Sequence, residues 1–102
     1  MSKTIYDGSA VDAYKSTNFM EFLEKTFKDV ELMNEESAPR SFKQAIMLPN
    51  EGVSLFYDIF SPRPYLRDGW EVKVNVTAFG AEEKISKVEQ IILAEAAKYA
   101  SK

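Results

Sequence analysis

The sequence predicts an α+β fold: a three-stranded antiparallel meander with an N-terminal helix and a long C-terminal amphipathic helix packed on one face. Two segments repeat apolar residues every three or four positions, as one face of a helix does. Between them lie three runs rich in β-branched and aromatic residues, separated by turn signals. With 102 residues, the chain has the length of a single domain, spanning residues 1–102.

The first half of the chain contains one strong helical signal. Residues 1–17 are polar and mixed, and predict no regular structure beyond a turn. A helix is predicted over residues 18–31, with Asn18 as its N-cap and Glu21 completing a capping box. Residues 31–41 are predicted to be a loop, because Pro39 lacks a backbone donor. The apolar face of this helix consists of Phe19, Phe22, Leu23, Phe27 and Val30.

The second half predicts the sheet and the last helix. Strands are expected over residues 42–48, 53–60 and 70–79, and Gly52 lies in the first connection. The third run alternates strictly, which is typical of a sheet with one packed and one solvent-facing side. The C-terminal helix is predicted over residues 81–99. Its apolar stripe consists of Ile85, Val88, Ile92, Ala96 and Tyr99, widened by Ile91 and Leu93.

Composition narrows the classes of function. The chain has no His and no Cys, so it lacks the commonest general base, thiolate nucleophiles and the usual zinc ligands. We therefore predict that it is not an enzyme and that it uses no cofactor and no metal. The formal net charge of −3 disfavours binding to nucleic acid through broad phosphate neutralisation. No apolar run is long enough to predict contact with a membrane, and the expected location is the cytoplasm.

The connection between the second and third predicted strands, residues 61–69, is the first candidate binding site. Arg63 and Arg67 flank Tyr65, and Pro62 and Pro64 stiffen the same segment. Tyr and Arg are enriched at binding hot spots. The loop is therefore predicted to present these three side chains to a protein partner. The alternative is a solvated loop whose arginines pair with nearby carboxylates.

The second candidate site is the sheet face turned away from the helices. Phe56, Phe60 and Phe79 have the outward parity of their strands, where a solvent-facing surface would be polar. Three covers are open: the N-terminal segment, a second copy of the chain, or another protein. The N-terminal segment would use Ile5, Tyr6, Val11 and Tyr14.

An acidic segment and a similarity in the order of elements contribute less to the prediction of function. The acidic residues Asp29, Glu31, Glu35 and Glu36 match no calcium-loop spacing and predict a solvated segment. The predicted order of elements is similar to that of double-stranded RNA-binding domains. The last helix of those domains opens with lysines, whereas Glu82 and Glu83 stand here. Acidic secretion chaperones, which form homodimers, share an α-β-β-β-α start.

These observations favour a non-catalytic protein–protein interaction module. It would be a small inhibitor or adaptor, or a subunit of a larger cellular or viral assembly, with a protein partner or self-association as its mode of action. A small-ligand-binding domain is one alternative. The other is a nucleic-acid-binding domain with a local basic patch, which would need Arg40, Lys43, Arg63, Arg67 and Lys73 on one face.

Overall fold

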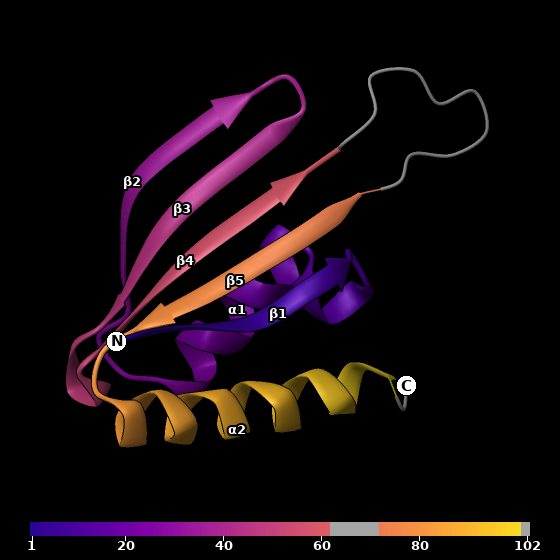
Figure 1. Ribbon diagram of the computed structural model, residues 1–102. Helices are drawn as coiled ribbons and strands as arrows, with labels where there is room; N and C mark the ends of the chain where they lie inside the picture. Colours follow the sequence, from indigo (N-terminus) through magenta and orange to yellow (C-terminus); the bar gives the residue numbers. More distant parts are fainter. Residues whose placement is uncertain (62–71, 101–102) are drawn as a thin grey trace.

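A computed structural model describes residues 1–61 and 72–100, which form an α+β fold with a five-stranded antiparallel sheet and two α-helices (Figure 1). The first strand leads into a 3-10 turn and the shorter helix. Four further strands follow, and a second 3-10 turn connects the middle two. The longer helix ends the fold. In chain order the elements are β1 (Ser2–Ser9), η1 (Asp12–Tyr14), α1 (Ser16–Thr26), β2 (Glu31–Ala38), β3 (Ser41–Leu48), η2 (Pro49–Glu51), β4 (Val53–Phe60), β5 (Lys73–Phe79) and α2 (Glu82–Ala100).

The strands are arranged in the order β1-β5-β4-β3-β2, so the first two strands of the chain form opposite edges of the sheet. The chain passes from one edge to the other through α1. It then returns through β3 and β4 to β5, which pairs with β1. Figure 1 shows both helices on the same side of the sheet. We call this side the inner face and the opposite side the outer face.

The prediction of three strands was wrong, because both edge strands were missed. β1 lies in the segment for which no regular structure was predicted, and β2 lies in the predicted loop. All eight side chains of β2 are exposed, so burial imposes no apolar period on its sequence. Both strands are held mainly by backbone pairing with a neighbour. The likeness in element order to RNA-binding domains and secretion chaperones therefore does not hold.

The first helix was predicted in the right place with wrong ends. It begins at Ser16, and Asn18 lies within its first turn rather than at the N-cap. The amide of Asn18 instead donates a hydrogen bond to the carbonyl of Asp12 at 2.9 Å. Phe27 has extended backbone angles and ends the helix, although its ring is buried. Asp29, with φ of 59°, then redirects the chain into β2.

The central hairpin agrees with its prediction. β4 covers the predicted residues, and Gly52 adopts the left-handed conformation, with φ of 65°, that closes the connection from β3. Few side chains other than glycine adopt this conformation without strain. Within the described residues β5 begins at Lys73, and the predicted start of this strand at residues 70–71 lies outside them.

The inner face of the sheet and the helices enclose an aromatic core. Phe19 of α1 is fully buried, with its ring 5.3 Å from that of Tyr57 on β4 and 5.0 Å from that of Phe22. The hydroxyl of Tyr57 donates a hydrogen bond of 2.7 Å to the carbonyl of Tyr14. Burial raises the pKa of Tyr57 far above its usual value, so this hydroxyl stays protonated.

The long C-terminal helix confirms the predicted stripe with one exception. Ile85, Val88 and Ile92 are buried against the sheet, whereas Leu93, predicted to widen the stripe, is 47% exposed. An ion pair of 2.8 Å between Lys3 of β1 and Glu89 joins the N-terminal strand to the helix. Both helices therefore belong to the inner layer.

Candidate functional site on the outer sheet face

The antiparallel register places outer side chains of neighbouring strands side by side. Phe56 lies on β4 between Ala45 of β3 and Thr77 of β5. Its neighbours are small, so the ring stands above them and is 44% exposed. Phe79 pairs with Ser2 and Ser54 in the same way and is 46% exposed. Short neighbours thus turn both rings into projections from the surface.

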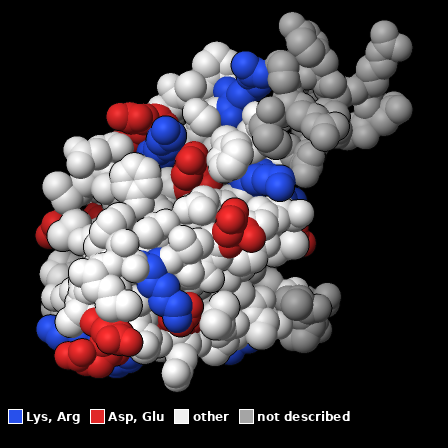
Figure 2. Space-filling view, viewed as in Figure 1, with Lys and Arg blue, Asp and Glu red and all other residues white. Residues whose placement is uncertain are grey.

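The outer face continues as a mixed apolar and charged surface across β2 and β3. Met33 pairs with Ala45 and is 44% exposed, so the row of side chains that includes Phe56 continues across the strands to the edge of the sheet. Met47 lies beside Ser54, whose hydroxyl donates to the methionine sulfur at 3.1 Å. In Figure 2, which has the viewpoint of Figure 1, uncharged side chains cover much of the surface between separate acidic and basic ones.

A carboxylate lies near the middle of this face. Asp58 pairs across the strands with Lys43 and Asn75, and Phe56 and Phe60 precede and follow it on the same face. Burial raises the pKa of Asp58, and the charge of Lys43 opposes that rise. Its Oδ1 atom is buried and has no hydrogen-bond partner among the described residues. Burying a carboxylate oxygen without a hydrogen-bond partner is costly.

The structure brings together half of the residues predicted as sites. Phe56, Phe60 and Phe79 share the outer face, and Phe60 is less exposed than the other two. Arg63, Tyr65 and Arg67 lie outside the described residues. Met33 was missed because β2 was read as a loop. Asp58 was missed as a site residue although its position between Phe56 and Phe60 gives it their parity.

The N-terminal segment does not cover the outer face, contrary to one of the three expected covers. Ile5 and Tyr14 are buried in the core on the inner side, and Tyr6 stacks on Tyr14 with ring centroids 3.7 Å apart. Val11 is 51% exposed. The pairing of β1 with β5 extends the sheet sideways instead of folding the segment over it. The other two covers expected from the sequence are a second copy of the chain and another protein.

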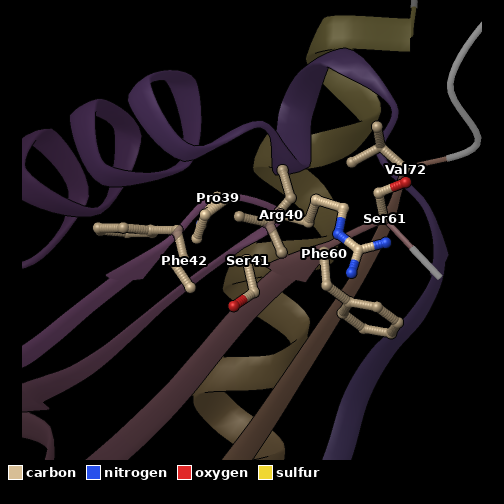
Figure 3. Close-up of a pocket in the computed structure, with 9 residues that line it drawn as sticks. Pro39, Arg40, Ser41, Phe42, Phe60, Ser61 and Val72 are labelled. Atoms are coloured by element: carbon tan, nitrogen blue, oxygen red, sulfur yellow. The ribbon is translucent and has the colours of Figure 1, made fainter. Parts of the chain in front are cut away.

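A cavity of about 420 Å³ lies beside the turn between β2 and β3 (Figure 3). Arg40 stands in its wall, and its carbonyl accepts a hydrogen bond of 3.0 Å from the amide of Ser61. The rest of the wall is mainly carbon. The cavity is lined by Ala38, Pro39, Arg40, Ser41, Phe42, Ile59, Phe60, Ser61 and Val72.

Among the residues that the structure describes, charged side chains elsewhere form no cluster typical of a metal site. Asp29 accepts a hydrogen bond of 3.3 Å from Asn50, while the glutamates of β2 are exposed. In the described ranges, no group of three or more acidic side chains could hold a metal ion. Lys43 and Lys73 share the outer face with Asp58, and Arg40 lies at the turn. No helix in the part of the chain that the structure describes combines the length and apolar character that a membrane span requires.

Comparisons of the chain with protein-family models, with curated proteins and with solved structures found no match.

Proposed function

We propose that the protein is a non-catalytic protein-binding module whose contact surface is the outer face of the sheet. The observation that carries this proposal is the pair of exposed rings, Phe56 and Phe79, on a face left uncovered by the described part of the chain. Exposed apolar groups that share one face with charged ones are typical of interaction surfaces. The lack of His and Cys agrees with a role in binding rather than catalysis.

Side-chain geometry supports the same proposal. Rings held above small neighbours on a rigid sheet lose little conformational freedom when a partner covers them. Asp58 lies beside Phe56 on the same face and adds a carboxylate charge to this surface. Phe56 and Asp58 lie on β4 and Phe79 on β5, so all three belong to regular strands of the sheet.

Affinity capture with a matched control tests the proposal. The tagged protein is expressed in its native host, and captured proteins are identified by mass spectrometry. We expect the Phe56→Ser/Phe79→Ser variant to lose every stoichiometric partner, a second copy of the chain included. The Leu93→Ser variant removes a leucine that is 47% exposed on α2 and should keep them. Equal capture by all forms, or no partner with the wild type, would contradict the proposal.

The cavity beside Arg40 favours a second candidate function, the binding of a small apolar molecule with an anionic group. Its volume of about 420 Å³ lies within the range of ligand pockets, and Arg40 supplies a cation at its wall. A thermal-shift screen with aliphatic and aromatic carboxylates tests this candidate. The expected result is a rise in melting temperature that Arg40→Leu abolishes and Lys25→Leu, on α1, retains. A screen without any shift would remove it.

A further inference from the structure

On the outer face, four successive residue pairs between the central strands β3 and β4 each combine complementary side chains. We call each of these pairs a level. At three levels a larger side chain lies beside a smaller one, and at the remaining level a cation lies beside a carboxylate. The larger partner is on β3 at one level and on β4 at two. From one end of the strands to the other, the β3–β4 pairs are Met47 with Ser54, Ala45 with Phe56, Lys43 with Asp58, and Ser41 with Phe60.

We propose that the outer face binds the same face of a second copy of this chain, related by a two-fold axis that runs parallel to the strands between β3 and β4. This inference rests on the proposed function and specifies the partner. Rotation about that axis lays β3 of one copy over β4 of the other and keeps each level opposite itself. Phe56 then faces the second copy's Ala45, and Phe60 faces its Ser41, so projections meet recesses.

The charged level is satisfied twice by the same rotation. Lys43 of each copy lies over Asp58 of the other, so each carboxylate gains an ammonium donor directed at its surface. In the described ranges Oδ1 of Asp58 is buried and has no hydrogen bond, so the second copy's ammonium group approaches the carboxylate from the surface and does not reach that atom. Within those ranges Lys43 forms no ion pair of its own. The charged level of one copy therefore complements that of the other across the axis.

The flanking strands agree with this arrangement over most of their length. The rotation lays β2 over β5, so that Met33 covers Thr77 and Glu36 covers Asn75. The mismatch is the corner pair of Glu31 and Phe79, and the twist of two packed sheets separates their corners. The central strands therefore carry the contact, and the corners form its rim.

The size of the face allows face-to-face pairing, and the character of the β2 edge disfavours the alternative. Under this rotation four strands of each copy overlap, and β1 extends beyond the contact. Strands spaced about 4.8 Å apart, with up to eight residues at about 3.3 Å each, overlap over roughly 500 Å² per copy, which is the minimum expected for one side of a specific interface. The β2 edge is a poor alternative. It carries Glu31, Glu35 and Glu36 and is irregular between Met33 and Glu36, features that oppose edge-to-edge pairing.

Complementary charge reversal distinguishes contact between copies from any role within one copy. In a dimer of the Lys43→Asp variant, a carboxylate of one copy would lie over a carboxylate of the other at the charged level. In a dimer of the Asp58→Lys variant, two ammonium groups would meet in the same way. In sedimentation equilibrium the wild type should have twice the 11.6 kDa chain mass, and each variant 11.6 kDa. An equimolar mixture of the two variants should regain the doubled mass, because each charge then faces its opposite.

The double variant Lys43→Asp/Asp58→Lys controls for misfolding, since it keeps the complementarity within one chain and should dimerise by itself. Circular dichroism checks that all forms are folded. A monomeric wild type at the highest concentration that stays in solution, dimeric single variants, or a monomeric mixture would each overturn the inference. A monomeric wild type whose capture of a different protein still depends on Phe56 and Phe79 would overturn the second copy as partner and leave the proposed function standing.

Discussion

The two faces of the sheet both carry apolar residues but have opposite surroundings. On the inner face of β4, Val53, Leu55 and Tyr57 are at most 2% exposed, beneath the helices. On the outer face of the same strand, Phe56 is 44% exposed, and the buried Oδ1 of Asp58 has no hydrogen-bond partner among the described residues. One strand thus contributes side chains both to the buried core and to an exposed surface. An apolar residue on a strand therefore does not by itself belong to the core, because the helices cover only one of the two faces.

The inner face should show the largest effect on stability. Phe19→Ala removes a fully buried ring that contacts the rings of Tyr14, Phe22 and Tyr57. The lost burial and the resulting cavity should lower the free energy of unfolding by about 3–5 kcal/mol. Urea unfolding followed by circular dichroism measures the loss. A loss below about 1 kcal/mol would show that this core is not close-packed.

Tyr57→Phe should have the next largest effect. The substitution keeps the ring but removes the hydroxyl that donates to the carbonyl of Tyr14. Leaving that buried acceptor without a donor should cost about 1–3 kcal/mol. The comparison with Phe19→Ala, by the same urea titration, separates ring packing from hydrogen bonding. An unchanged unfolding midpoint would mean that water replaces the hydroxyl.

The outer face should respond weakly in stability and strongly in association. Phe56→Ser in the isolated monomer should change the free energy of unfolding by less than about 1 kcal/mol, because the ring is already 44% exposed. The measurement is made at a dilution where sedimentation shows the monomer. A destabilisation comparable with that of Phe19→Ala would place Phe56 in the core and remove the distinction between the faces.

The smallest expected effect is a dependence of stability on pH through Asp58. Burial raises the pKa of its carboxyl in the folded chain, so the folded state binds the proton more tightly than the unfolded state does. The stability from this group is complete below the ordinary pKa of aspartate and is lost as pH rises from that value through the raised one. In the dilute monomer, Asp58→Asn should remove that decline. Parallel stability profiles for the two forms would contradict the assignment.

The sequence predicted those elements whose side chains are sorted by burial. The predicted bounds of β4 agree with the structure, and those of α2 are within one residue, because each has a regular apolar period. Strand parity also placed Phe56, Phe60 and Phe79 on one face. The edge strands escaped prediction because backbone pairing holds them while most of their side chains remain exposed. Their sequences therefore resemble those of loops.

The pairing of complementary side chains on the outer face could not be predicted from the sequence, for a different reason. It depends on which residue of β3 lies beside which residue of β4, and a slip of one position would turn every side chain to the other face. The sequence shows Lys43 and Asp58 far apart, with no indication that they share a level. The register supplies that information through the pairing of Ala45 with Phe56 and its neighbours.

The most direct test of the account is an isotope-filtered nuclear Overhauser experiment on a mixed sample. One half of the protein carries ¹³C at its alanine methyl groups, and the other half is unlabelled. The filter records only contacts between a labelled and an unlabelled copy. The two-fold pairing predicts a cross-peak between the methyl group of Ala45 in one copy and the ring of Phe56 in the other. A filtered spectrum without that cross-peak, at concentrations where the mass is doubled, would contradict the proposed pairing of outer faces.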